Sequence, residues 1–157
     1  MKPNIGISDS NLKEVATLLN NLIADEYLLY TKTRNAHWNI QGQNFIELHK
    51  FFEGQYEALD EIIDDVAERI RSLGHFSLGS LKDFLSVARL TEQNHDFSNQ
   101  KKIIQSLLND HETIIRILRK DIVSTAGKFK DLGTSDFVTG LMEKHEKMAW
   151  MLRAYNN

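Results

Sequence analysis

Residues 44–74, NFIELHKFFEGQYEALDEIIDDVAERIRSLG, set the architecture of this chain because they predict one long amphipathic helix. The helix begins near Asn44, where Glu47 completes a capping-box pattern three residues later, and Gly74 is a natural residue to end it. Its apolar side chains recur at the spacing of an α-helix: Leu48, Phe52, Leu59, Ile63, Val66, Ile70 and Leu73. We expect this segment to be the second helix of a helical protein.

Three other segments show the same period, over about residues 11–38, 98–124 and 135–155. The first of them opens with a second capping-box pattern, at Asn11 and Glu14.

The connection between the second and third segments, residues 75–96, is long and contains one short amphipathic piece, residues 81–87. A connection of this length can run back along the bundle, so that the two helices it joins lie parallel. The sequence therefore predicts an all-α fold, a ferritin-like four-helix bundle with a short extra helix in the long crossover between helices two and three.

Composition narrows the class of protein. The 157 residues fit one domain, residues 1–157, with no cysteine and one proline, Pro3. Metal or redox chemistry would therefore use His, Asp and Glu. The net charge of −3 is far from that of a dedicated nucleic-acid-binding domain. The sequence has neither a signal-peptide pattern nor a membrane-spanning run, so we expect a soluble, cytoplasmic protein with no membrane partner.

The second helix is unusually acidic. Between residues 47 and 71 it has three basic residues and eight carboxylates: Glu47, Glu53, Glu57, Asp60, Glu61, Asp64, Asp65 and Glu68. A solvated helix face would explain a random acidic stripe. Here, however, the missing basic partners at i,i+4 leave like charges to repel one another. The pattern suggests that bound cations balance the charge.

Two histidines sharpen this prediction. His37 lies in the last turn of the first helix and His49 in the second turn of the second, so a tight hairpin brings them side by side. Glu53 follows His49 by one turn on the same face. Each histidine alone would be read as a packing residue, but together with Glu53 they form a ligand set that suits Fe, Mn or Zn.

Asp64 and Glu68 form a second carboxylate pair at i,i+4. They cannot join the first group within one straight helix, because the 11 residues from Glu53 to Asp64 span about 16 Å. Two copies of the helix packed antiparallel about a two-fold axis would bring this pair of one chain to the histidines of the other, twice per dimer. The sequence thus makes a metal site between two subunits plausible.

A di-iron centre inside one bundle is the alternative, and it needs inward Glu-x-x-His motifs on two helices. The match in this sequence, Glu92 to His95, falls in the predicted connection. We therefore expect no intra-bundle di-iron centre.

The ligand residues belong to a pattern of fragments that extends over nearly the whole chain. These are His37-Trp38-Asn39-Ile40-Gln41-Gly42, Phe45, His49, Phe52-Glu53, Asp60, Asp64-Asp65-Val66-Ala67-Glu68-Arg69, Gly74, residues 81–87, and His145 with Trp150. Any one fragment is a weak signal, but the combination is highly specific. It resembles the Dps family, the mini-ferritins of bacteria.

The resemblance implies a dodecameric homo-oligomer, a hollow shell built on two-fold dimers whose interfaces hold sites that oxidise iron. It also implies which residues bind the metal, with zinc as a substitute for iron: His37, His49 and Glu53 of one subunit with Asp64 and Glu68 of its two-fold partner. Family members often have Asp where this chain has Glu53. The longer side chain keeps the carboxylate but would alter metal spacing or occupancy.

The same resemblance implies a ferroxidase and iron-storage function. Hydrogen peroxide, or more slowly O₂, would oxidise Fe²⁺, and the Fe³⁺ would form a mineral inside the shell, which protects against oxidative stress. Trp38 resembles the tryptophan beside the metal site in relatives; a core aromatic at a helix end is the alternative.

The resemblance also implies roles for four further carboxylates. Glu57 and Glu61 are candidates for mineral nucleation, with ordinary solvated acids as the alternative. Asp131 and Asp136 resemble the lining of the family's iron-entry pores, although carboxylates near a helix N-terminus are also favoured by its dipole.

Strong DNA binding is not expected, because relatives that bind DNA often use Lys/Arg-rich tails that neutralise phosphates. Here the N-terminus offers only Lys2 before Lys13, and the last five residues contain one arginine, Arg153. Two other functions stay open: a DNA-compacting shell protein with weak or vestigial metal chemistry, and a helical oligomer with a structural zinc at its interface.

Overall fold

The structure, a computed structural model, describes residues 3–92 and 97–155. Its helices are α1 (Asp9–Asn39), α2 (Phe45–Ser72), α3 (Leu81–Val87), α4 (Gln100–Val123), the short π-helix η1 (Ser124–Lys128) and α5 (Leu132–Tyr155). These ranges contain no strand, and none of their helices has the length and apolar character needed to cross a membrane. The predicted all-α, ferritin-like fold class is confirmed.

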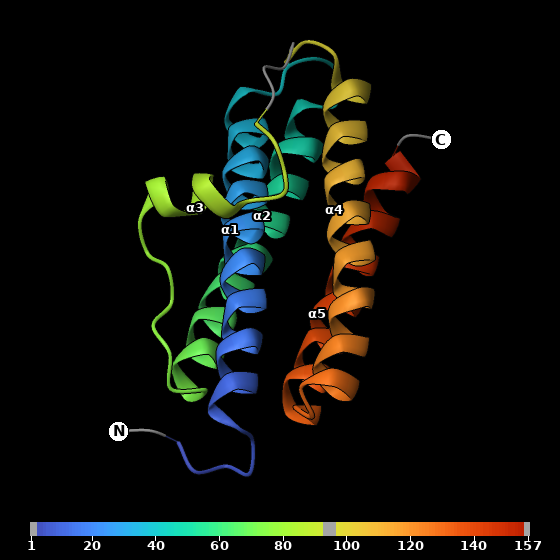
Figure 1. Ribbon diagram of the computed structural model, residues 1–157. Coiled ribbons are helices and arrows are strands. Elements are labelled where there is room, and N and C mark those ends of the chain that lie inside the picture. Colours follow the sequence, from blue (N-terminus) through green and yellow to red (C-terminus); the bar gives the residue numbers. More distant parts are fainter. Residues whose placement is uncertain (1–2, 93–96, 156–157) are drawn as a thin grey trace.

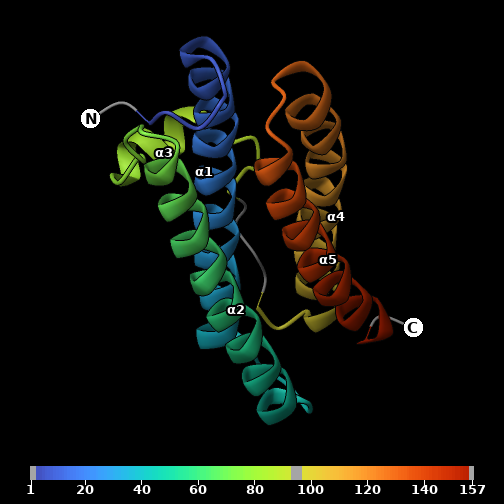
Figure 2. The same ribbon diagram turned by 90° about the horizontal axis from the view of Figure 1, so that it is seen from below.

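The four long helices form two antiparallel pairs (Figures 1 and 2). α1 lies beside α2 and α4 beside α5, while α3 lies across α1. Both α2 and α4 run from top to bottom of Figure 1, so they are parallel, as the long connection predicts. A hydrogen bond from Gln41 N to Phe97 O (3.2 Å) joins the chain just before α2 to the chain just before α4.

A buried carboxylate fixes the part of the connection that follows α3. Asp25 is fully buried in α1. Its Oδ1 accepts hydrogen bonds from Arg89 N (2.5 Å) and Leu90 N (3.1 Å), and its Oδ2 accepts one from Arg89 Nε (2.7 Å). The rings of Tyr27 and Phe84, 4.7 Å apart, hold α3 itself against α1. These contacts keep the connection on the outside of the first helix pair.

The start of α1 differs from the prediction. Ser8 is the N-cap, and its hydroxyl accepts a hydrogen bond from Asn11 N (3.3 Å), so the helix begins at Asp9 and the predicted cap at Asn11 is wrong. The Asn11 side chain instead donates to Phe129 O (3.1 Å), which ties α1 to the loop after η1. Asn44 is the N-cap of α2 as predicted, but its side chain makes no capping hydrogen bond.

Gly74 ends α2 as predicted, in a Schellman motif. Gly74 N donates to Arg71 O (3.0 Å) and His75 N donates to Ile70 O (3.2 Å). The φ of Gly74 is +83°, and a Cβ at this position would lie 2.6 Å from Pro3 Cδ. A side chain is therefore excluded both by the backbone conformation and by the N-terminal segment packed against it.

A chain of hydrogen-bonded polar side chains crosses the core. Glu26 of α1, His111 of α4 and His145 of α5 are fully buried. His145 Nε2–H donates to Glu26 Oε1 (2.9 Å), and the Nδ1 atoms of His145 and His111 share a hydrogen bond (2.9 Å). Glu26 Oε2 and His111 Nε2 have no partner among the described residues. Burial, with a smaller effect of nearby His145, lowers the pKa of His111 well below its usual range.

Acid is expected to destabilise the protein through His111. The unfolded chain takes up a proton here near pH 6.5, whereas the folded chain does so only at much lower pH. The contribution of neutral His111 to stability is therefore complete above about pH 6.5 and falls below it by at most ~1.4 kcal/mol per pH unit. Urea unfolding from pH 7 to pH 5 should show a shallower pH dependence in His111→Leu than in wild type. The control His75→Leu should follow wild type, and an unchanged slope in His111→Leu would contradict the assignment.

Candidate metal centre

The hairpin between α1 and α2 brings His37 and His49 into direct contact. His37 Nδ1–H donates to His49 O (2.8 Å), and His49 Nδ1–H donates to His37 O (2.9 Å). The two rings stack with their centroids 3.7 Å apart and their planes at 21°. Because a carbonyl oxygen only accepts, each Nδ1 carries the hydrogen, and each neutral ring has its lone pair on Nε2. Backbone carbonyls therefore fix the tautomer and orientation that a metal-binding histidine needs.

Aromatic rings and one carboxylate lie around the His37–His49 pair. His37 is buried, and Tyr56 meets its ring edge-to-face at 5.2 Å. Phe45 lies 5.3 Å from the ring of His49. Glu53 is half-buried one turn after His49 on α2. Burial, with a smaller effect of the Glu53 carboxylate, raises the pKa of Tyr56.

The Arg34 guanidinium makes cation–π contacts with three aromatic rings at the edge of this site. Its guanidinium carbon lies 5.0 Å from the ring of Trp38, 5.0 Å from that of Tyr56 and 5.5 Å from that of Tyr30. Its Nη1 donates to Tyr30 Oη (2.6 Å), and this hydrogen bond is the largest cause of the raised pKa of Arg34. Trp38 is 61% exposed, so it is not the core aromatic of the alternative interpretation.

Asp64 and Glu68 lie farther along α2, where both are exposed. Within residues 3–92 and 97–155, no three His, Asp or Glu side chains converge as a metal site. The structure thus brings His37 and His49 together, with Glu53 on the next turn of α2. Completion of the site by Asp64 and Glu68 of a second subunit stays a prediction.

The other acidic candidates differ in their surroundings. Glu57, Glu61 and Asp136 are exposed, whereas Asp131 is only 2% exposed. Asp131 Oδ1 accepts hydrogen bonds from Thr134 N (2.9 Å) and Arg69 Nη2 (3.1 Å), so this residue caps the start of α5 and links it to α2. Glu92 is exposed and His95 lies outside the described residues, so the structure does not test the prediction made from the Glu92-to-His95 motif.

Two groups of residues were not predicted as part of a site. Arg34, Tyr30 and Tyr56 form the cluster beside His37, and the i,i+4 spacing from Tyr30 through Arg34 to Trp38 was a usable signal for it. The Glu26–His145–His111 chain joins residues far apart in the sequence, and a polar residue in each apolar stripe would have been its signal.

Fold and site together define a ferritin-like bundle, and the model of the ferritin-like domain family matches residues 16–157. The chain is 45% identical over 152 residues to an uncharacterised low temperature-induced protein of Nostoc sp., covering 97% of this chain and 85% of the relative. It is 33% identical over 145 residues to DNA protection during starvation protein 2 of Bacillus anthracis, covering 92% and 98%.

Among solved structures, the Dps protein of Vibrio cholerae O1 is similar with a TM-score of 0.92 at 33% identity, covering 99% of this chain and 97% of that chain. That protein is described as a member of a broad superfamily of ferritin-like diiron-carboxylate proteins. The chain belongs to the Dps family, the iron-storage mini-ferritins.

Proposed function

We propose that this protein is a ferroxidase and iron-storage mini-ferritin. It oxidises Fe²⁺, preferentially with hydrogen peroxide and more slowly with O₂, and stores Fe³⁺ as a mineral inside a dodecameric shell in the cytoplasm. Removal of Fe²⁺ and peroxide together protects the cell against oxidative stress. The observation that carries the proposal is the reciprocal pair of hydrogen bonds that leaves Nε2 of both His37 and His49 available to a metal.

The donor set suits an iron substrate that changes oxidation state. Imidazole nitrogen and carboxylate oxygen both bind Fe²⁺, and the harder oxygen ligands favour the Fe³⁺ product. His37, His49 and Glu53 supply two nitrogens and one carboxylate from a single chain. Asp64 and Glu68 of the two-fold partner add two more carboxylates, and zinc occupies the same ligands as a substitute. Coordination positions left open by these ligands admit the oxidant.

Other residues take supporting roles in this proposal. Trp38 lies beside the metal-binding residues, held by Arg34. Glu57 and Glu61 start mineral growth from the inner surface of the shell. Of the two pore candidates, exposed Asp136 is better placed to meet incoming iron than Asp131, which already pairs with Arg69.

An iron-oxidation assay tests the function directly. Fe²⁺ is added to the intact protein without oxygen, hydrogen peroxide follows, and ferric absorbance and particle size are recorded. We expect oxidation faster than in the protein-free control, with the iron kept in solution in particles the size of the shell. Oxidation at the protein-free rate would refute the ferroxidase proposal.

DNA compaction is the alternative function, and the names of relatives such as the Bacillus anthracis protein refer to DNA protection. We expect no gel shift of linear DNA by the intact protein at about 150 mM salt, because a chain with a net charge of −3 releases few counterions from phosphates. A variant with an added lysine-rich tail serves as the positive control. A clear shift by the wild-type protein would favour the alternative.

A further inference from the structure

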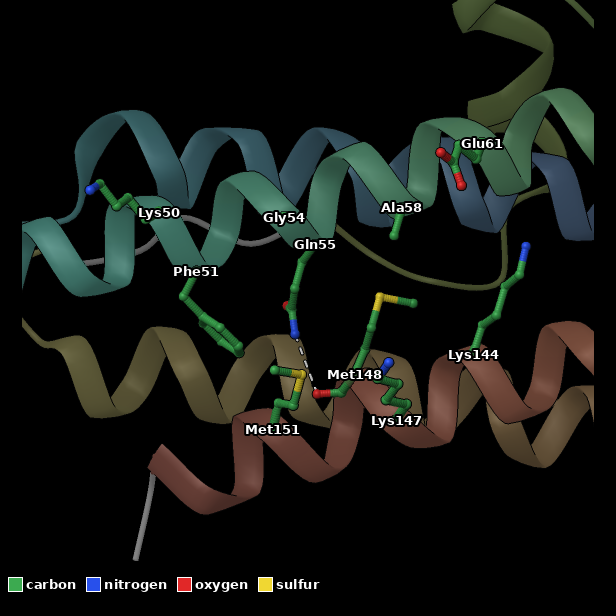
Figure 3. A pocket seen from close by; sticks show the side chains of 10 residues that line it. All are labelled: Lys50, Phe51, Gly54, Gln55, Ala58, Glu61, Lys144, Lys147, Met148 and Met151. Carbon is green, nitrogen blue, oxygen red and sulfur yellow. Dashed lines mark hydrogen bonds between the residues drawn. The ribbon is translucent and has the colours of Figure 1, made fainter.

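A cleft lies between α2 and α5, and neither His37 nor His49 is among the residues that line it. Its volume is about 500 Å³, within the usual range of small-molecule sites. Ten residues line it: Lys50, Phe51, Gly54, Gln55, Ala58 and Glu61 from α2, and Lys144, Lys147, Met148 and Met151 from α5. In Figure 3, Phe51 and Gln55 extend from α2 toward α5, and Met148 and Met151 extend back from α5. The cleft is therefore formed by side chains of both helix pairs of the bundle.

Its walls suit a flat apolar body. Phe51, Ala58, Met148 and Met151 are its apolar side chains, and the ring of Tyr155 lies 5.0 Å from that of Phe51. Thioether sulfur makes favourable contacts with aromatic rings, and methionine side chains adapt to the shape of a ligand. Gly54 adds room, since a Cβ built there would meet nothing within 4 Å. An aromatic ring system fits this lining better than a sugar or a nucleotide.

Charge at the cleft favours an anion. Three lysines and one glutamate line it, a net charge of +2 in a chain whose net charge is −3. Lys144 makes an ion pair with Asp65 at 3.6 Å, but both side chains are about half exposed, so this pair is readily exchanged for another carboxylate. Lys144 and Lys147 are three residues apart on α5. In Figure 3, Lys147 lies beside Met148, and Lys144 extends toward α2 on the side of Glu61. An acidic group at this end of a ligand would be attracted by both ammonium groups.

Gln55 adds a requirement for a hydrogen-bond donor. Its side chain is 4% exposed at the cleft, and its Nε2 donates to Met148 O (3.3 Å). The amide oxygen, Oε1, is buried with no partner among the described residues. A buried acceptor without a donor costs about 1–3 kcal/mol, so a ligand that donates to it binds more tightly. A hydroxyl group on the apolar body would supply that donor once the Gln55 amide turns its oxygen toward the cleft.

We propose that this cleft binds an aromatic carboxylate that carries a hydroxyl group. Its rings lie between Phe51 and the two methionines, its carboxylate meets Lys144 and Lys147, and its hydroxyl donates to Gln55 Oε1. The cleft contains none of the proposed iron ligands of the oxidation site and shares only Glu61, a candidate for mineral nucleation, with the proposed function. Ligand binding here does not depend on the proposed ferroxidase activity.

Three probes separate the parts of this proposal in calorimetric titrations of the intact protein. Hydroxynaphthoate has all three features, naphthoate lacks the hydroxyl, and naphthol lacks the carboxylate. Hydroxynaphthoate should bind most tightly, with each of the others about tenfold weaker. Gln55→Met should abolish the preference for hydroxynaphthoate over naphthoate. Lys147→Met should weaken both acids, whereas the control Lys102→Met on α4 should not. Equal affinity for all three probes, or no binding, would overturn the proposal.

A blocking substitution tests the location. Gly54→Leu fills the cleft, and the matched control Gly140→Leu introduces the same side chain at a helical glycine that is also open and lies on α5 outside the cleft. Both changes favour the helix, so circular dichroism and the melting temperature should show folded protein. Hydroxynaphthoate binding should fall at least about tenfold in the first variant alone. Equal binding by both variants, or a side chain of a second copy seated in the cleft in a structure of the assembly, would overturn the proposal.

Discussion

His49→Ala is expected to lower the initial rate of protein-dependent Fe²⁺ oxidation at least ~100-fold. The substitution removes one nitrogen ligand. It also removes the hydrogen bond to His37 O and the ring stacked on His37, so the remaining histidine loses part of its orientation. The rate is measured from ferric absorbance after addition of peroxide to protein preloaded with Fe²⁺ without oxygen.

His75→Ala is the matched control for this experiment. His75 follows α2 at its other end, beyond Gly74, and its backbone oxygen, not its ring, accepts a hydrogen bond from Arg71. The control should oxidise iron at the wild-type rate. Equal rates in His49→Ala and wild type would show that the histidine pair does not bind the substrate.

His145→Leu is expected to cause the largest loss of stability, about 3–5 kcal/mol. The change removes the His145 ring that donates to Glu26 and leaves the Glu26 carboxyl group buried in the core, with His111 Nδ1 also without its partner. The free energy of unfolding is measured by urea titration near neutral pH.

The double variant Glu26→Leu/His145→Leu should be more stable than His145→Leu alone, because it no longer buries a carboxyl group without its hydrogen-bond partner. His75→Leu again serves as the control at a half-buried histidine. If the free energy of unfolding of His145→Leu were within about 1 kcal/mol of the wild-type value, the hydrogen bonds of Glu26, His145 and His111 would not stabilise the fold.

Most of the fold could be predicted from local patterns. The apolar stripe of α2 and the glycine at its end are short-range signals, and both the helix and its Schellman motif are present as expected. The start of α1 could not be fixed in the same way. Ser8 and Asn11 are both good N-cap residues, and the contact of Asn11 with Phe129, a residue 118 positions away, favours Ser8 as the cap.

The candidate site was predictable only where neighbours in the sequence are also neighbours in space. His37 and His49 face each other because a short hairpin joins their helices, which the spacing indicates. Their reciprocal hydrogen bonds depend on the separation of two backbones, which no spacing specifies. The pairing of His111 with His145 depends in the same way on the packing of α4 against α5.

Site roles that require a second subunit depend on contacts that lie outside a single chain. Asp64 and Glu68 are exposed on α2, and the contacts within one chain leave them available to a partner. For Asp131, contacts within the chain change the predicted role in an iron-entry pore. Its side chain caps α5 and forms an ion pair with Arg69, and these contacts already explain an acidic residue there.

A subunit-mixing experiment tests the central claim, that each site combines ligands of two subunits, most directly. His49→Ala and Glu68→Ala proteins are each expected to be inactive alone. After unfolding and reassembly as an equal mixture, half of the two-fold dimers contain one subunit of each kind, and one of the two sites in such a dimer has every ligand intact. Iron oxidation should therefore recover to about one quarter of the wild-type rate. Failure of the mixture to exceed the two separate variants would contradict a shared site.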